Sequence, residues 1–344
     1  MQKPVLVIKL GTAVITNLHG EIDETIIKKL AEEISHLSKT NNVVLVSSGA
    51  VGAGKPFIKN YKGTLIERKA AAAVGNPILI QLYHTYFSRF GITVAQALCE
   101  RHHFSNRSQF LQLKQTFTEF WNNNILPVVN ENDLVSNVEL KFSDNDELST
   151  LIAIGFDADT LVICTSVGGF LNAEKQIIPL IDKIDDKIRA FVHSEKSALG
   201  LGGMVSKLTF TRLATSLGIK VVMNGLSGES PLIAALSGSQ GTTFTPQKPN
   251  LKARKKWLAS GSITIGSLHV DVGAEKALLN RKSLLTVGIS DVKGSFSAGE
   301  VVQLINEQEN IIGVAKVKLD AVEMAGQIAK KNVLAAHSDD IVMF

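Results

Sequence analysis

The chain has 344 residues, of which 45% are hydrophobic and 20% charged, and its formal net charge is +4. This length allows two domains, and the balance of apolar and charged residues is typical of a globular protein with a sizeable core. The sequence has no apolar run close to the roughly 18 residues that a membrane-spanning helix needs. Its two cysteines offer neither a disulfide framework nor a zinc-binding spacing, so we expect a cytoplasmic location without a membrane partner.

The N-terminal part of the chain, up to Phe244, alternates between strand-like and helix-like segments. Short runs of apolar and β-branched residues indicate buried strands, at 5–10, 42–46, 92–95, 125–129, 160–164 and 220–223. Apolar residues at helical spacing indicate helices, at 25–37, at 66–73 with 76–90, at 109–121, from 148 onwards, and at 205–217. This alternation predicts an α/β fold, a three-layer αβα sandwich around a mostly parallel sheet. Ligands of such sheets bind at the carboxyl ends of the strands.

The pattern changes after Phe244. Two prolines and a basic stretch predict an exposed linker at 247–260. Short β-like segments follow, at 262–265, 269–270, 301–305, 311–315 and 333–335, with one helix-like piece at 273–279. We therefore expect a larger domain at 1–246 and a small β-rich barrel at 261–344. Beyond Trp257, 8 Lys and Arg stand against 10 Asp and Glu, which argues against nucleic-acid binding there without excluding it.

The segment from Gly49 to Lys55 follows a predicted strand and fits most of the phosphate-binding P-loop pattern. That pattern requires Ser or Thr after the lysine, because the hydroxyl ligates Mg²⁺. Pro56 stands there instead, with neither a hydroxyl nor an N–H group. We expect these glycines to tighten a strand–helix turn or to let the backbone approach a ligand.

Polar or glycine-rich motifs occur where predicted strands end, at 9–12, 47–50, 130–133, 144–146 and 202–207. Lysines and glycine-rich turns suit phosphoryl transfer, which needs cations, backbone N–H groups around the phosphates, and rigid positioning. The Asn, Asp and Ser clusters suit a small zwitterionic substrate. The sequence therefore indicates a kinase-like site spread over several strand ends.

The order and spacing of these motifs resemble the glutamate 5-kinase family, a branch of the amino acid kinase superfamily. The most specific element is Val-Asn-Glu-Asn-Asp at 129–133 followed by Asp-Asn-Asp at 144–146. Segments at 270–274, 283–285 and 294–300 resemble the PUA domain of many bacterial members. The resemblance implies an amino acid kinase fold for the larger domain. It also implies ATP-dependent phosphorylation of the L-glutamate γ-carboxylate, the first step of proline biosynthesis.

Carried over residue by residue, the resemblance assigns catalysis to Lys9, Lys207 and Asp146, with Asp146 holding the two lysines. It assigns glutamate binding to four further residues: Ser48, Gly49, Asp133 and Asn145. It assigns nucleotide binding to Lys9, Gly11, Thr165, Ser166 and a 201–207 loop made of Leu201, Gly202, Gly203, Met204, Val205, Ser206 and Lys207. It further implies Mg²⁺ bound mainly through the ATP phosphates, no protein metal site, proline as a feedback inhibitor, and a homo-oligomer.

The sequence departs from the usual family pattern in two places, the turn that follows the predicted strand at 160–164 and the residue before Gly202. Ser166 stands where the family usually has Asp, and Leu201 where it commonly has Thr. These changes bear on nucleotide affinity and preference more than on the chemistry. Two other functions remain open. One is an amino acid kinase with a different acid or nucleotide substrate. The other is an RNA-binding or regulatory protein that uses the PUA-like domain.

Overall fold

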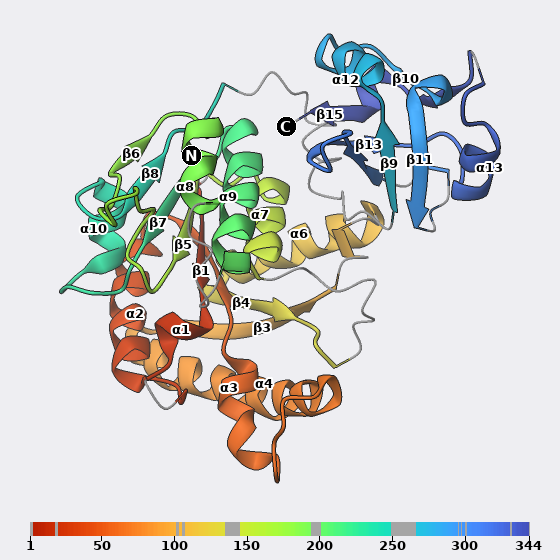
Figure 1. Ribbon diagram of the computed structural model, residues 1–344. Helices are drawn as coiled ribbons and strands as arrows, with labels where there is room; N and C mark the ends of the chain where they lie inside the picture. The colour runs from red at the N-terminus through yellow and green to blue at the C-terminus, as the bar shows by residue number, and fades with distance from the viewer. Residues whose placement is uncertain are drawn as a thin grey trace. The chain divides into compact units, whose positions relative to one another are not determined.

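The computed structural model describes residues 3–17, 20–100, 103–104, 107–134, 145–193, 201–248, 266–294, 296, 298–299, 301–330 and 332–343. The chain forms two compact units, Met1–Glu100 with Gln112–Lys248, and Arg101–Leu111 with Pro249–Phe344 (Figure 1). Across the described ranges, we find no helix with both the length and the apolar character needed to cross a membrane.

The larger unit is built on an eight-stranded sheet in the order β3-β4-β2-β1-β5-β7-β8-β6. Its strands are β1 (Val5–Leu10), β2 (Asn42–Ser47), β3 (Thr93–Cys99), β4 (Ile125–Glu131), β5 (Thr160–Cys164), β6 (Leu180–Ile181), β7 (Lys220–Asn224) and β8 (Thr242–Phe244). All neighbours pair in parallel except β7 and β8. Strand β1 is buried along its whole length, between β2 and β5. The carboxyl ends of the central strands therefore meet at one edge of the sheet.

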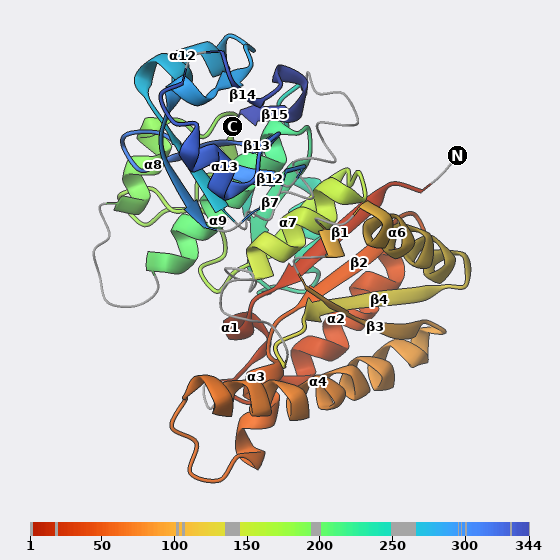
Figure 2. The ribbon, with the colours of Figure 1, turned by 90° about the vertical axis from the view of Figure 1, so that its right-hand side faces the viewer.

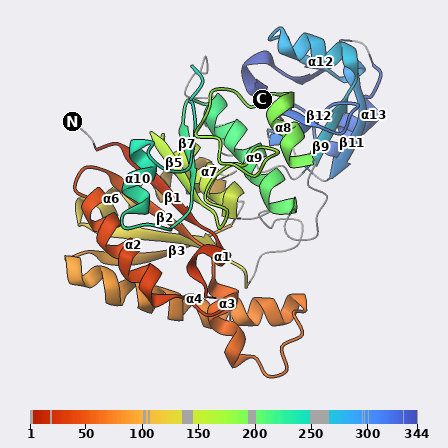
Figure 3. The same ribbon diagram turned by 60° about the vertical axis from the view of Figure 1, so that its left-hand side comes forward.

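Helices cover both faces of this sheet (Figures 2 and 3). They are α1 (Thr12–Ile15), α2 (Glu24–Leu37), α3 (Ala50–Gly54), α4 (Leu65–Phe87), α6 (Arg107–Asn122), α7 (Asn145–Gly155), α8 (Asp186–His193), α9 (Leu201–Ser216) and α10 (Pro231–Ser237). Helices α2 and α4 lie on one face, and α7 and α9 on the other. This arrangement confirms the three-layer αβα sandwich.

Strand alternation decides which layer each side chain near the edge reaches, because successive residues of a strand point to opposite faces. In β1, Ile8 and Leu10 join the core cluster that contains α2 and α4, whereas Lys9 contacts Asp146 of α7. At the end of β2, Ser47 contacts Tyr83 of α4. The backbone of the central strands thus delivers polar groups to both helical layers at the same edge.

Glycines form the turn after β2 and allow a close backbone contact between helices α3 and α4. Gly49 has a φ of 105°, a conformation that side chains rarely tolerate, and it begins α3. A Cβ atom at Gly54 would lie 1.9 Å from the Ala71 carbonyl oxygen of α4. A Cβ atom at Gly75 would lie 1.8 Å from the carbonyl oxygen of Ala50. The expected tight turn is present, and the close backbone approach joins α3 to α4.

The smaller unit is rich in β-structure, as expected. Its strands are β9 (Gly266–Val270), β10 (Leu284–Leu285), β11 (Ile289–Gly294), β12 (Val301–Ile305), β13 (Ile311–Lys316), β14 (Leu334–Ala336) and β15 (Ile341–Met343), and its helices are α12 (Val272–Leu279) and α13 (Ala321–Gly326). Five strands form a sheet in the order β11-β9-β12-β13-β15, and β10 pairs with β14. The segment expected at 262–265 lies outside the described residues.

Candidate active site

A carboxylate with a lysine on each oxygen lies at the carboxyl edge of the sheet. Lys9 Nζ lies 2.7 Å from Asp146 Oδ1, and Lys207 Nζ lies 2.8 Å from Asp146 Oδ2. The Asp146 side chain is only 1% exposed, and those of Lys9 and Lys207 are 6% and 16% exposed. The three catalytic residues expected from the sequence are therefore in contact.

Three different elements supply this cluster. Lys9 is the penultimate residue of β1, Asp146 lies in the first turn of α7, and Lys207 lies in the second turn of α9. A carboxylate in the first turn of a helix is favoured by the positive end of the helix dipole. Two ammonium groups on one carboxylate leave a net charge of about +1 in a poorly solvated place. That charge suits a ligand with several negative oxygens.

A second polar group lies beside the first, around the amide of Asn145. Asn145 Nδ2 donates to Ser48 Oγ at 2.8 Å and to Asn130 Oδ1 at 3.1 Å. Gly49, expected in the same site, directly follows Ser48 and sets the turn into α3. The structure thus brings together Ser48, Gly49 and Asn145, three of the four residues assigned to the substrate.

The fourth, Asp133, is half-buried in the turn two residues beyond β4. Its neighbour Asn132 donates to Glu100 Oε1 at 2.8 Å, which ties this turn to the residue after β3. Asp133 therefore lies after a strand whose carboxyl end belongs to the same edge. Asp144, from the Asp-Asn-Asp motif, lies outside the described residues.

Helix α4 adds two polar groups that the sequence reasoning missed. Asn76 Oδ1 accepts a hydrogen bond of 3.0 Å from Asn130 Nδ2. The Tyr83 hydroxyl lies 2.7 Å from Ser47 Oγ, and burial raises the pKa of this phenol above its usual range. The sequence held one signal for Asn76: it lies in the segment Ala-Val-Gly-Asn-Pro, inside an otherwise apolar predicted helix. A buried amide at such a place needs a hydrogen-bond partner.

The turn after β5 contains two residues expected at the nucleotide. Thr165 is buried and donates its backbone N–H to the Asn224 carbonyl at the end of β7, at 2.7 Å. Ser166 is exposed. Gly11 lies on the neighbouring strand end, where a Cβ atom would be 3.7 Å from Lys9 Nζ. Thr165 and Gly11 therefore flank the end of β5, and Gly11 lies next to the lysine cluster.

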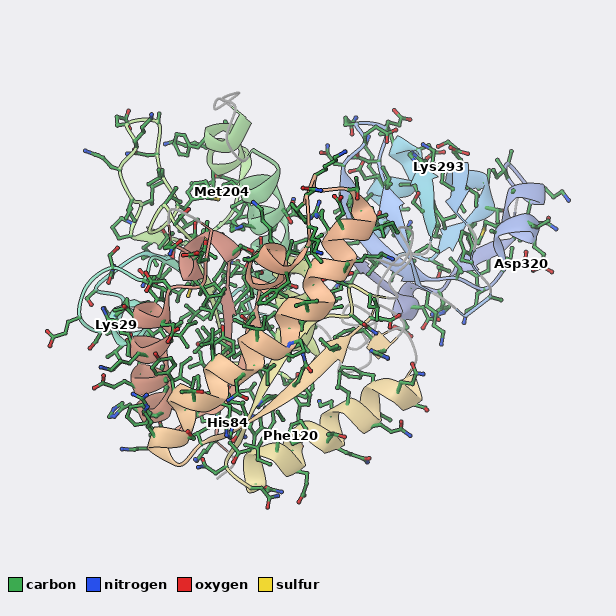
Figure 4. The ribbon with its side chains drawn as sticks, turned by 90° about the horizontal axis from the view of Figure 1, so that it is seen from below. Lys29, His84, Phe120, Met204, Lys293 and Asp320 are labelled. Atoms are coloured by element: carbon green, nitrogen blue, oxygen red, sulfur yellow. The ribbon has the colours of Figure 1, made fainter. Side chains whose placement is uncertain are left out.

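The segment 201–207 differs from the expectation of a loop. These residues form the first two turns of α9, which begins at Leu201 (Met204 is labelled in Figure 4). The prediction of a loop was wrong because Gly202 and Gly203 suggested a break, whereas both lie in the first turn of α9, at the modest entropic cost of a helical glycine. A helix start still presents backbone N–H groups without intrahelical partners, as a phosphate-binding loop would.

Both cysteines are free and buried, Cys99 at the end of β3 and Cys164 at the end of β5. Burial raises the pKa of each thiol to about 12, although Lys9 opposes the rise at Cys164. Neither thiol is therefore a nucleophile near neutral pH.

Comparison with known proteins agrees with this arrangement. A model of the amino acid kinase family matches residues 4–223, and a model of the PUA domain matches residues 266–337. Curated relatives are named glutamate 5-kinase. That of Aquifex aeolicus is 38% identical over 324 residues, covering 93% of this chain and 90% of the relative. That of Kosmotoga olearia is 35% identical over 341 residues, covering 98% of this chain and 93% of the relative.

Solved structures of low sequence identity share the fold. A carbamate kinase of Giardia has a TM-score of 0.51 at 16% identity, covering 72% of this chain and all of that one. The UMP kinase of Ureaplasma parvum has a TM-score of 0.50 at 13% identity, covering 71% of this chain and all of that one. At these identities the likeness supports the αβα fold alone.

Proposed function

We infer the function from the premise that this chain belongs to the amino acid kinase family, and within it to the glutamate 5-kinases. The protein transfers the γ-phosphoryl group of ATP to the side-chain carboxylate of L-glutamate. The products are γ-glutamyl phosphate and ADP, and the reaction opens proline biosynthesis. The observation that carries the proposal is the Asp146 carboxylate with Lys9 and Lys207 on its two oxygens, at the carboxyl edge of the sheet.

The acceptor of this reaction needs no general base. A glutamate side chain has an ordinary pKa of about 4.3, so its carboxylate is already an ionised nucleophile at neutral pH. One carboxylate oxygen forms a bond to the γ-phosphorus, and the bond from that phosphorus to the oxygen bridging to ADP breaks. The difficulty is electrostatic, because an anion approaches the phosphate chain of ATP. Catalysis therefore depends on cations and on positioning.

Lys9 and Lys207 supply these cations, and Asp146 holds them. We assign Lys9 to the transferring phosphoryl group and Lys207 to the nucleotide side, where charge accumulates as ADP departs. A salt-bridged lysine is held in one place, so it stabilises the transition state without reorganising during the reaction. Asp146 is a positioning residue in this scheme, since both of its oxygens face ammonium groups.

Glutamate binds beside this cluster, at Ser48, Gly49, Asp133 and Asn145. Asp133 is a suitable partner for the α-ammonium group, and Ser48 for a carboxylate. The turn at Thr165 and Ser166, with Gly11 and the start of α9, binds ATP. The backbone N–H groups of that helix start support this assignment. Ser166, which replaces the acidic residue usual in the family, lowers the negative charge near the nucleotide.

Mg²⁺ supplies charge neutralisation on the ATP phosphates when it is bound. The described residues contain no cluster of three or more His, Cys, Asp or Glu suited to a metal ion. The carboxylate nearest the phosphates in this scheme, Asp146, is engaged by two lysines. We therefore assign the ion to the nucleotide phosphates, which commonly carry it in kinases.

A coupled ADP-release assay with a panel of acidic amino acids tests the proposal. We expect Mg²⁺-dependent ADP formation with L-glutamate, and an acyl phosphate that hydroxylamine traps as a hydroxamate. Faster turnover of aspartate, acetylglutamate or a nucleoside monophosphate would favour another activity of the family.

Regulation and assembly are proposed at the level of the family. We expect proline to compete with glutamate, because both carry an α-amino group beside a carboxylate. An initial rate that stays flat across a proline titration at subsaturating glutamate would contradict this. We also expect a homo-oligomer, which sedimentation of the full chain would detect.

A further inference from the structure

Four side chains form a hydrogen-bonded row that crosses the carboxyl edge of the sheet. The row runs from Asn76 on α4, through Asn130 at the end of β4, to Asn145 on α7 and Ser48 after β2. Its three links measure 3.0, 3.1 and 2.8 Å. Helices α4 and α7 lie on opposite faces of the sheet, so the row joins the two helical layers.

The direction of each hydrogen bond is fixed from the Asn145 end. The atom of Asn145 that faces the Ser47 carbonyl, at 3.4 Å, must be the amide nitrogen, because a carbonyl only accepts. That nitrogen also donates to Asn130, so Asn130 presents Oδ1 to it. Asn130 then turns its Nδ2 to Asn76, which must accept through Oδ1. Asn76 thus ends the row as an obligatory acceptor.

This polarity determines what the site offers to a ligand. With Nδ2 of Asn145 engaged, its Oδ1 remains an acceptor, and no described residue donates to it. The Ser48 hydroxyl accepts from Asn145, so its own hydrogen remains available, and no described residue receives it. A hydrogen-bond acceptor, Asn145 Oδ1, thus lies beside a donor, the Ser48 hydroxyl. The acceptor matches an ammonium group of a ligand, and the donor matches a carboxylate. Reversing the Asn130 amide would set two carbonyl oxygens against each other and undo the match.

We propose that Asn76, by accepting from Asn130 through its Oδ1, holds the amides of Asn130 and Asn145 in this orientation and thereby favours substrates that carry an α-ammonium group. Asn76 is a positioning residue, since it acts through Asn130. Its burial, at 8% exposure, and its place in the 23-residue helix α4 hold the acceptor still. The inference rests on the proposed function for its substrate and adds a specificity determinant to it.

A matched pair of variants separates the acceptor from the shape of the side chain. Asn76→Asp keeps an acceptor oxygen in the same place, and Asn76→Leu keeps the approximate volume without any acceptor. Thr85→Ala, at an exposed position of the same helix, is the control for general effects on α4. The readout is kcat/KM for L-glutamate divided by that for glutarate, which lacks only the α-amino group, together with the KM for ATP.

For Asn76→Leu we expect glutamate KM to rise about tenfold and the glutamate-to-glutarate ratio to fall about tenfold, with ATP KM within about twofold of the parent. Asn76→Asp should keep the ratio within about threefold, and Thr85→Ala within about twofold. If Asn76→Leu does not fold, Asn76→Ala carries the same expectation.

A glutamate-to-glutarate ratio in Asn76→Leu or Asn76→Ala equal to that of the parent would overturn the inference. An equal fall of this ratio in Asn76→Asp and Asn76→Leu would overturn it as well. Failure of the proposed function is a separate result, because the parent would then not turn over glutamate. The same ratio, measured with the acid that the parent does phosphorylate and its deamino analogue, would still decide the role of Asn76.

Discussion

Lys9 and Asp146 form an ion pair of 2.7 Å in which both side chains are almost completely withdrawn from water. The two residues are far apart in the sequence. Lys9 lies at the end of the central strand β1, and Asp146 lies at the start of helix α7, whose residues are almost all buried. A buried pair of this kind is costly to break, because the remaining charge loses both its partner and its hydration. The pair therefore fixes the position of the Lys9 ammonium group before any substrate arrives.

Replacing Lys9 with Met tests its role in the transition state. The substitution keeps most of the apolar stem and removes the charge. We expect kcat to fall by roughly two to four orders of magnitude, which corresponds to about 3–5 kcal/mol of lost stabilisation. Glutamate KM should change much less, because the residues that bind glutamate remain. A kcat within a few fold of the parent would show that Lys9 has no catalytic role.

Lys207 and Asp133 should give opposite kinetic patterns. Lys207→Met should lower kcat and raise ATP KM, since α9 is assigned to the nucleotide. Asp133→Ala should raise glutamate KM at least tenfold and leave ATP KM nearly unchanged, because its carboxylate is assigned to the α-ammonium group. Steady-state kinetics with each substrate varied in turn would check the contrast. A parallel loss in all parameters would indicate misfolding instead.

Glu33 should matter for stability and little for chemistry. Its Oε2 accepts from the backbone N–H groups of Leu232 and Ile233 at 2.8 and 3.1 Å, so it caps the first turn of α10 from α2. Glu33→Ala should lower the free energy of unfolding by about 2 kcal/mol, because one buried and one partly buried backbone donor lose their acceptor.

The neighbouring Glu32 is exposed and provides the control, Glu32→Ala, in the same urea titration. Equal stabilities of the two variants would contradict the capping role. The kcat of folded Glu33→Ala should stay within about threefold of the parent.

The buried thiols predict how the protein responds to alkaline pH. Burial raises the pKa of Cys99 and Cys164 from 9.0 to about 12, so the folded state holds these protons more tightly than the unfolded chain. Their contribution to stability is complete below about pH 9 and is lost as the pH rises towards about 12. At pH 8, a thiol reagent should label neither cysteine in native protein and both in denaturant. Rapid stoichiometric labelling of the native protein would refute this.

The fold was largely predictable because its parallel strands are short, continuous and apolar. The run Val-Leu-Val-Ile-Lys-Leu of β1 is bounded by Pro4 and Gly11, so its period and limits are clear. The short antiparallel strand β8 and helix α10 were missed because each is only a few residues long. Local patterns of that size do not distinguish structure from loop.

The site was predictable where charge and motif spacing mark it, and less so where packing builds it. Lys9, Asp146 and Lys207 are recognisable as charged residues within or beside glycine-rich or acidic motifs. Asn76 lies more than fifty residues before its partner Asn130, and only the register of α4 over β4 brings the two amides together. No local pattern encodes that register, because it depends on tertiary packing between segments far apart in the sequence.

The separation of the charged residues along the chain has a consequence for protein synthesis. Lys9 is made almost at once, Asp146 follows much later, and Lys207 follows after a further 61 residues. Until Cys164 has been made, β1, which pairs with β5 across more than a hundred residues, lacks one neighbour. Pairings of such long range form slowly and leave apolar strand edges exposed on the nascent polypeptide. The nascent polypeptide is therefore most prone to aggregate before β5 has left the ribosome, and it lacks activity until α9 has followed.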